Sequence, residues 1–206
     1  MFRLLTCVLF VSLVPSEVEP LDGAPAAAID RVEEDWEVVV KSGNVEAAGP
    51  QITTTMCPGA TSDHPTINFN LNYRDHPSFH AGGLQVLAWD GGDLLDSASS
   101  HSESLQTDGE TIAWTQRLSL ANGIAEFRVV SGLSTTWGEF GGDDLAIMFE
   151  VALEDLTSYT PDISIGKSGI GWQSDHVESM KLVRVRYYCG ETLVGTDETT
   201  RVIHLD

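Results

Sequence analysis

The chain has 206 residues and a formal charge of −20 at pH 7, with 31 acidic residues against 11 lysines and arginines. A charge this negative argues against nucleic acid and anionic membranes as partners, because both are polyanions. The length suits one domain with a sizeable core, which we expect over residues 29–206.

Residues 1–28 have the pattern of a secretory signal followed by a loose leader. The basic residue Arg3 precedes a short apolar run from Leu4 to Val11, an arrangement typical of signal peptides and too short to span a membrane. No later apolar run is long enough to cross a bilayer. We therefore expect a secreted protein without membrane insertion.

The cysteines divide between the leader and the domain. Loss of the leader removes Cys7 and leaves Cys57 and Cys189. In an oxidising compartment two remaining cysteines favour one disulfide, and the alternative is two separate thiols.

Apolar residues alternate with polar ones in many short segments, the period of β-strands with one buried face. No segment shows a sustained helical period, although residues 158–162 could hold a single helical turn. Short alternating strands separated by Gly and Asn turns indicate an all-β fold, an antiparallel two-sheet β-sandwich or a barrel. In chain order we predict strands at 32–40, 51–56, 66–73, 83–89, 111–120, 124–130, 145–151, 181–188 and 201–205, and loops at 97–110 and 131–143.

The first strand carries three acids on one parity, Glu33, Asp35 and Glu37. Alternate carboxylates on one strand face lie about 7 Å apart, near the separation that glycosidases use. The alternative is a solvated face of an edge strand, whose acids discourage edge pairing. Glu34, of opposite parity, stands where an aliphatic core residue is expected.

The clearest alternation lies at 66–73, where apolar residues interleave with asparagines. Ile67, Phe69, Leu71 and Tyr73 are predicted to face the core, and the opposite face carries three asparagines with Arg74 at its end. Amides offer donors and acceptors that suit sugar hydroxyls. We therefore predict that this face contacts a glycan, the alternative being a plain solvated face: Asn68, Asn70, Asn72 and Arg74.

The C-terminal part resembles the closing segment of concanavalin A-like lectin, glucanase and laminin-G sandwiches, through YTPD at 159–162, SGIGWQS at 168–174 and VESMKLVRVRYY at 177–188. In that family a Gly-x-Gly-aromatic turn precedes a strand beside the chain ends. The resemblance implies a jelly roll with one concave sheet, glycan binding on or beside that sheet, and often calcium. The acidic motif at 33–37 is also similar to the catalytic strand of a glucanase branch. The whole domain further resembles secreted domains of planctomycete-type bacteria.

Three aspartates offer oxygen ligands of the kind calcium takes, namely Asp90, Asp93 and Asp96. Ordinary turn chemistry is the alternative, because Asp and Gly commonly serve the backbone of turns. Calcium is accordingly a candidate cofactor.

Two tryptophans, Trp137 and Trp172, lie in polar, Gly-rich surroundings. An exposed indole can stack on a sugar ring, and the alternative is an indole folded onto the rim of the core. Together these features predict a non-catalytic module that binds an extracellular glycan or surface polymer. A structural or adhesive domain is the second hypothesis, and a glycoside hydrolase using Glu33, Asp35 and Glu37 is the third.

Overall fold

The structure is a computed structural model that describes residues 28–41, 50–61, 63–72, 83–100 and 108–206. The predicted signal and leader, up to residue 27, lie outside the described residues, as do Tyr73 and Arg74.

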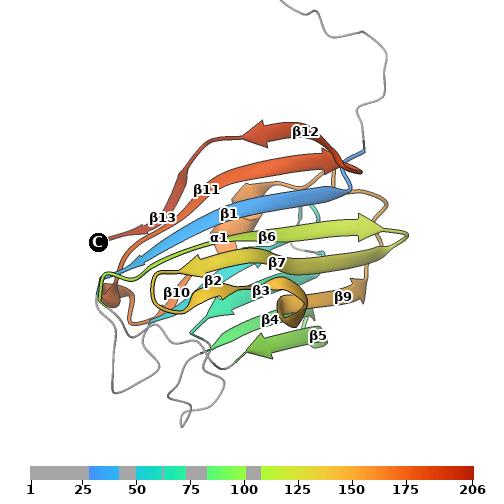
Figure 1. Cartoon of the computed structure of the whole chain (residues 1–206). Coiled ribbons are helices and arrows are strands. Elements are labelled where there is room, and N and C mark those ends of the chain that lie inside the picture. Colours follow the sequence, from blue (N-terminus) through green and yellow to red (C-terminus); the bar gives the residue numbers. More distant parts are fainter. Residues whose placement is uncertain (1–27, 42–49, 62, 73–82, 101–107) are drawn as a thin grey trace, which may run out of the picture.

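Sheet A, the larger of two antiparallel sheets, consists of β1 (Arg31–Val40), β6 (Thr111–Ala121), β7 (Ile124–Ser134), β8 (Gly138–Phe140), β9 (Ala146–Glu150), β11 (Val177–Cys189), β12 (Thr192–Asp197) and β13 (Arg201–Leu205). Its order is β12-β11-β1-β6-β7-β8, with β13 also paired to β11 and β9 to β7. Figure 1 shows β11, β1, β6 and β7 as its long central strands.

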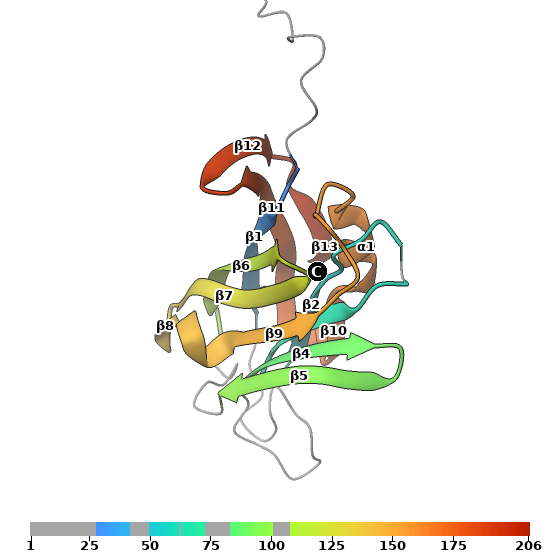
Figure 2. The same cartoon turned by 90° about the vertical axis from the view of Figure 1, so that its right-hand side faces the viewer.

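Sheet B consists of β2 (Gln51–Met56), β3 (Thr66–Leu71), β4 (Leu84–Asp90), β5 (Asp93–Ser100) and β10 (Gly169–Trp172), in the order β10-β2-β3-β4-β5. The short helix α1 (Pro161–Lys167) packs against β2, and two single-turn 3-10 helices, η1 (Gly142–Leu145) and η2 (Ser174–His176), complete the fold. Figure 2 shows the two layers from the side. The predicted antiparallel two-sheet β-sandwich is confirmed.

The core lies between the sheets because each long strand buries one parity of its residues. On β3, Ile67, Phe69 and Leu71 are fully buried, as the alternation predicted. Trp36 of β1 stacks on Trp114 of β6 at a ring distance of 6.2 Å, and Phe69 meets Trp114 edge to face at 5.7 Å. These aromatic contacts join the sheets near their middle.

Several strands were not predicted, because they carry polar or glycine-rich sequences. β5 begins at Asp93 and includes the Ser-rich residues 97–100, and β8 lies within the predicted loop 131–143. β12 was also missed, and the predicted turn at 169–172 is strand β10. Such strands form because a neighbouring strand supplies their backbone partners, a contribution that side-chain patterns do not reveal.

The cysteines correct another prediction. Cys57 follows β2 in sheet B, whereas Cys189 ends β11 in sheet A, and both are free thiols. Cys57 is fully buried, with its sulfur 3.4 Å from the Thr61 carbonyl oxygen. The predicted disulfide is wrong. An oxidising compartment permits a disulfide, but it does not bring two cysteines close enough to form one.

Truncation of Phe69 should destabilise the domain by about 3–5 kcal/mol, because Phe69→Ala opens a cavity between the two sheets. Phe69 touches the rings of both Trp114 and Phe140. Urea unfolding would measure the free energy of unfolding. Val202→Ala, at a residue that is 54% exposed on β13, is the matched control and should change it by less than about 0.5 kcal/mol. Equal losses in the two variants would contradict this packing.

Candidate functional site: a groove on the outer face of sheet A

The acidic motif lies on the outer face of sheet A. β1 is a central strand between β11 and β6, so the edge-strand interpretation of these acids is wrong. Alternation turns Glu34 and Trp36 into the core and Glu33, Asp35 and Glu37 outward. The sequence correctly placed the three acids on one face, but an isolated strand pattern cannot tell which strands flank it.

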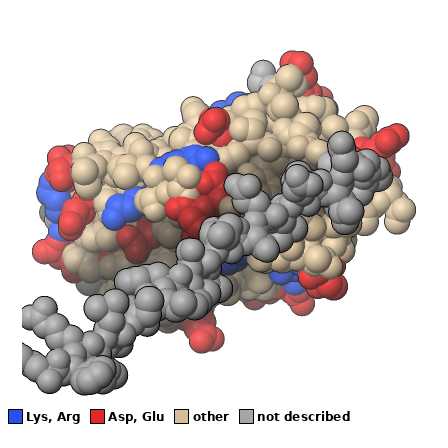
Figure 3. Space-filling view, turned by 90° about the horizontal axis from the view of Figure 1, so that it is seen from above, with Lys and Arg blue, Asp and Glu red and all other residues tan. Residues whose placement is uncertain are grey.

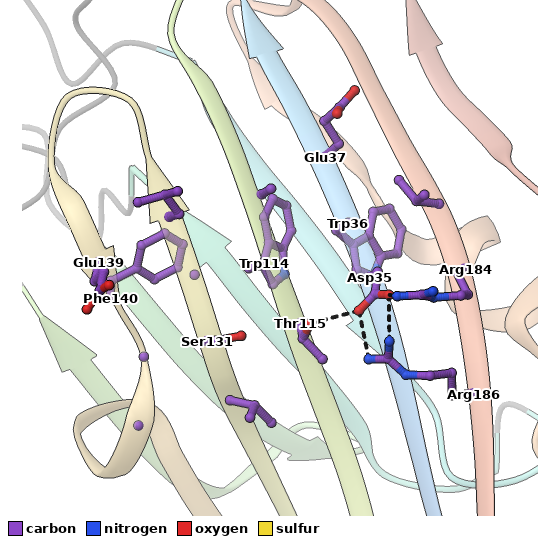
Figure 4. A pocket seen from close by; sticks show the side chains of 17 residues that line it. Asp35, Trp36, Glu37, Trp114, Thr115, Ser131, Glu139, Phe140, Arg184 and Arg186 are labelled. Atoms are coloured by element: carbon purple, nitrogen blue, oxygen red, sulfur yellow. Dashed lines mark hydrogen bonds and ion pairs between the residues drawn. The ribbon is translucent and has the colours of Figure 1, made fainter. Parts of the chain in front are cut away.

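Asp35 is the centre of a dense set of hydrogen bonds (Figure 4). Its Oδ2 accepts from Arg184 Nε at 2.8 Å and Nη2 at 2.6 Å, and from Arg186 Nη1 at 3.0 Å. Its Oδ1 accepts from Arg186 Nη2 at 2.9 Å and Thr115 Oγ1 at 2.7 Å. The bonds to Asp35 raise the pKa of the Arg184 guanidinium above its usual value. Both groups are therefore held in fixed orientations.

The flanking acids are paired in the same way. Glu33 accepts from Arg117 Nε at 2.9 Å and from the Tyr188 hydroxyl at 3.1 Å, and it lies 3.1 Å from Arg186 Nη2. Glu37 is more loosely paired, 3.6 Å from Lys181 Nζ. We name these seven residues the charge ladder: Glu33, Asp35, Glu37, Arg117, Lys181, Arg184 and Arg186.

Two β-bulges border one row of this face. The row runs across the sheet as Arg184, Asp35, Thr115 and Ser131, which are successive cross-strand partners. Next to this row, the pairing of β1 with β11 shifts register between Asp35 and Trp36. The pairing of β6 with β7 shifts in the same way between Thr115 and Gln116. Bulges re-aim side chains and often accompany functional sites.

A groove of about 900 Å³ lies over this row. Its floor is low because the central strands present small residues outward, Ala113 and Thr115 on β6 and Ser131 on β7. Longer side chains stand on either side. Because four strand spacings separate β11 from β8, the groove spans about 19 Å across the sheet.

The two walls differ in chemistry. One wall carries Val183 and Arg184 from β11, and the other carries Leu133 and Glu139, which are cross-strand partners on β7 and β8. Leu133 and Val183 are 57% and 38% exposed. In Figure 4, Glu139 stands across the groove from Arg184. The groove thus combines a polar floor with exposed apolar contacts on both sides.

The second wall depends on a glycine. A Cβ at Gly132 would lie 2.2 Å from the Phe140 ring. Glycine therefore lets this ring pack against the β7 backbone, where it contacts Phe69 and Trp137. That packing fixes β8 and with it Glu139.

Most lysines and arginines of the described residues lie beside carboxylates. Figure 3 shows Lys and Arg atoms lying beside Asp and Glu atoms rather than forming a basic patch. Beyond the charge ladder, Arg128 is 2.6 Å from Asp143, and Arg201 is 2.6 Å from Asp197. The Arg201 bond holds the pKa of Asp197 at about 2. Such pairing leaves the acidic excess in unpaired carboxylates.

Directly behind the groove, Glu34 is fully buried between the sheets. Its Oε2 accepts from Trp36 Nε1 at 2.9 Å and Gln116 Nε2 at 2.8 Å, and its Oε1 is hydrogen bonded to the Tyr159 hydroxyl. Tyr159 is also 3.2 Å from Ser164 Oγ on α1. Both oxygens of the carboxyl group therefore have hydrogen-bond partners, as burial of such a group requires.

Burial raises the pKa of Glu34, and hydrogen bonds from Tyr159, Trp36 and Gln116 only partly oppose that rise. The positive charge of Arg201 also opposes the rise in the pKa of Glu34. Burial and the Glu34 charge also raise the pKa of Tyr159. A proton on Oε1 would satisfy the network, since Glu34 could then donate to Tyr159 and Tyr159 to Ser164.

Glu34→Gln should remove a pH-dependent loss of stability. Because the folded-state pKa of Glu34 lies above the ordinary value of 4.5, its contribution is complete below that value and is lost as pH rises through the folded-state pKa. A glutamine retains the acceptor for Trp36 and Gln116 and donates to Tyr159. Thermal melts from acidic to alkaline pH should show the wild type losing stability relative to Glu34→Gln.

Glu34→Leu is the control for this prediction. Leucine leaves the Trp36, Gln116 and Tyr159 donors without an acceptor. The variant should therefore be less stable at every pH, by about 1–3 kcal/mol for each unsatisfied donor. Parallel pH profiles of the wild type and Glu34→Gln would contradict a raised pKa.

The amides of Asn68 and Asn70 are hydrogen bonded to side chains of the neighbouring strands of sheet B. Thr53 Oγ1 donates to Asn70 Oδ1 at 2.6 Å, and Thr55 Oγ1 donates to Asn68 Oδ1 at 3.1 Å. Asn70 is 8% exposed, and Asn72 is fully buried. The prediction that Asn72 faces outward is wrong, because its left-handed φ of 56° ends β3 and its amide donates to the Pro50 carbonyl at 2.9 Å.

The two candidate tryptophans lie apart from the groove floor. Trp137 is half-buried against the rim of the core, 5.9 Å from the Phe140 ring, as the alternative interpretation expected. Trp172, on β10 of sheet B, is 50% exposed. Neither lines the groove.

The aspartates proposed for calcium lie in the β4–β5 hairpin. Asp90 and Asp93 pair across the β4–β5 hairpin. Asp96 accepts from the Ser97 amide at 2.8 Å and the Met148 amide at 3.0 Å. Within the described ranges, no group of three or more His, Cys, Asp or Glu side chains is arranged to hold a metal ion. Asp96 thus bonds to backbone amides, the kind of role that the alternative interpretation gave these residues.

No model of a known protein family matches the chain. No curated protein matches it either. Among the described residues, no helix has the length and apolarity needed to cross a membrane.

Sequence reasoning found one part of the site and missed the rest. The acids of β1 were recognisable by their spacing, but their cations come from β6 and β11, about 80 and 150 residues away. A signal for the floor was present: Thr111, Ala113, Thr115 and Ser119 form a run of small residues on one parity of β6, interrupted by Arg117.

Proposed function

We propose that the protein is a secreted, non-catalytic module that binds a glycan in the groove on the outer face of sheet A. The observation that carries the proposal is a row of four cross-strand partners bordered by two bulges. The row starts at Arg184 on one wall of the groove of about 900 Å³ and crosses its floor through Asp35, Thr115 and Ser131. The groove takes the place of the asparagine face as the candidate site.

The floor suits hydroxyl groups. A hydroxyl both donates and accepts, so it is bound best where donors and acceptors alternate at short range. The Ser131 hydroxyl can donate and accept, and Thr115 Oγ1 keeps acceptor capacity because its own proton is donated to Asp35. Arg184 keeps Nη1 as a donor, 4.0 Å from Glu198, while its bonds to Asp35 fix its orientation. Preorganised groups lose little conformational entropy when a ligand binds. The exposed Leu133 and Val183 can contact the C–H faces of sugar rings.

Catalysis is less well supported, although the groove contains acids with glycosidase-like spacing. Both Asp35 oxygens accept hydrogen bonds from arginine, and Glu33 is held by Arg117 and Arg186. A carboxyl group that acts as general acid must exchange its proton with substrate. These carboxylates are instead committed to the charge ladder, which favours the binding module over the hydrolase.

The resemblance to concanavalin A-like sandwiches agrees with this proposal at one point. That family places its ligands on or beside one sheet face, and the resembling strand β11 lies between β1 and the last strand, β13. β11 also contributes Arg184 and Arg186 to the groove. Export by the predicted signal at residues 1–28 would expose the groove to extracellular glycans.

Ser131→Trp should abolish glycan binding without unfolding the domain. Ser131 is exposed on the groove floor, so an indole there fills the groove while leaving the core unchanged. A glycan array followed by calorimetry would measure affinity, and thermal melting would check folding. Ser97→Trp, at an exposed residue of β5 on the other sheet, is the matched control.

Three outcomes would decide between the functions. Loss of binding in Ser131→Trp but not in Ser97→Trp supports the binding module. Absence of any glycan that distinguishes the two variants favours a structural or adhesive domain. Release of reducing sugar from a bound glycan, lost in Asp35→Asn, would establish the hydrolase instead.

A further inference from the structure

The charges that line the groove do not cancel. Its acids are Asp35, Glu37 and Glu139, and its cations are Arg184 and Arg186. The lining itself therefore has one acid in excess, with Lys181 pairing Glu37 from outside it, and the chain as a whole has a formal charge of −20. A protein field of one sign concentrates ligands of the opposite sign.

Most hydrogen-bond donor nitrogens of the two arginines are already used by carboxylates of the protein. Arg186 directs Nη1 and Nη2 to Asp35, and Nη2 also lies 3.1 Å from Glu33. Arg184 directs Nε and Nη2 to Asp35, and its remaining Nη1 lies 4.0 Å from Glu198. An anion bound through the paired donors would displace these partners, at the cost of leaving carboxylates unpaired.

The acids are less fully used. Glu139 is exposed on the wall formed by β8, and no hydrogen bond or ion pair joins it to another described residue. Glu37 is 39% exposed, with Lys181 Nζ no closer than 3.6 Å. Both carboxylates therefore have acceptor capacity left for a cationic group that enters the groove.

We propose that the glycan bound in this groove carries amino groups, so that ammonium substituents meet Glu139 and Glu37 while ring hydroxyls lie over Asp35, Thr115 and Ser131. The ligand class is a glucosamine-type polysaccharide with free amines. This inference rests on the proposed glycan-binding function and specifies its substrate class.

The test compares two probes that differ in one substituent. A β-1,4-linked glucosamine oligomer carries an ammonium group where a cello-oligosaccharide of equal length carries a hydroxyl. Calorimetry at about pH 5.5, where the amine is protonated, should give at least about fivefold tighter binding of the glucosamine oligomer at low salt. The preference should shrink as salt is added, because screening weakens ion pairs between exposed groups.

The Glu139→Gln variant tests whether the preference for the glucosamine oligomer arises in the groove. This variant should bind the glucosamine oligomer about two- to fivefold more weakly, the range of one exposed ion pair, and the cello-oligosaccharide with unchanged affinity. Glu178→Gln, at an exposed acid of β11 outside the groove lining, is the matched control. Oligolysine serves as a probe of non-specific attraction to the acidic chain. Its affinity should be the same for the wild type and for Ser131→Trp.

The outcomes separate the inference from the function on which it rests. Equal affinity for the two oligomers, each lost in Ser131→Trp, would keep the glycan-binding function and overturn the preference for amines. Tighter binding of an oligouronate would overturn it in the same way. Binding of neither oligomer, with no effect of Ser131→Trp on any glycan, would remove the proposed function itself. Equal losses in Glu139→Gln and Glu178→Gln would reduce the preference to overall charge.

Discussion

The interaction on which the rest of the structure depends is the hydrogen-bond network around the buried Glu34. Thr54 of sheet B donates to Gln116 at 2.8 Å, Gln116 donates to Glu34, and Glu34 meets Tyr159 beside Ser164 of α1. The network therefore ties β1 to β6, to the opposite sheet and to the helix. A buried polar network is favourable only when every member is satisfied. This condition fixes the register of β1, because a shift of one residue would bury other acids without partners.

The groove follows from that register. Once Glu34 lies inside, Asp35 must lie outside, where it meets Arg184, Arg186 and Thr115. The strand thus serves two purposes through its two faces, a polar junction within the core and a charged floor on the surface. The bulges beside the row and the small residues of the central strands then open the space above it.

The asparagine face and the groove both carry polar side chains, but they differ in how many of these side chains remain exposed to a ligand. The amide oxygens of Asn68 and Asn70 already accept hydrogen bonds from threonines of the adjacent strand of sheet B. In the groove the ion pairs fix the polar groups, yet Ser131 and Glu139 stay exposed on its floor and wall. Exposure of donors and acceptors after internal pairing, rather than their number, decides which face can bind a ligand.

The sequence by itself determined the fold class, the buried face of β3 and the common face of Glu33, Asp35 and Glu37. Each of these depends only on the period of two along a strand. The tertiary structure alone decided that β1 is a central strand, that the Asp35 partners come from β6 and β11, and that Cys57, after β2, and Cys189, at the end of β11, are free thiols. These facts depend on which distant strands become neighbours. That choice is made by the packing of the whole core and leaves no local pattern in the sequence.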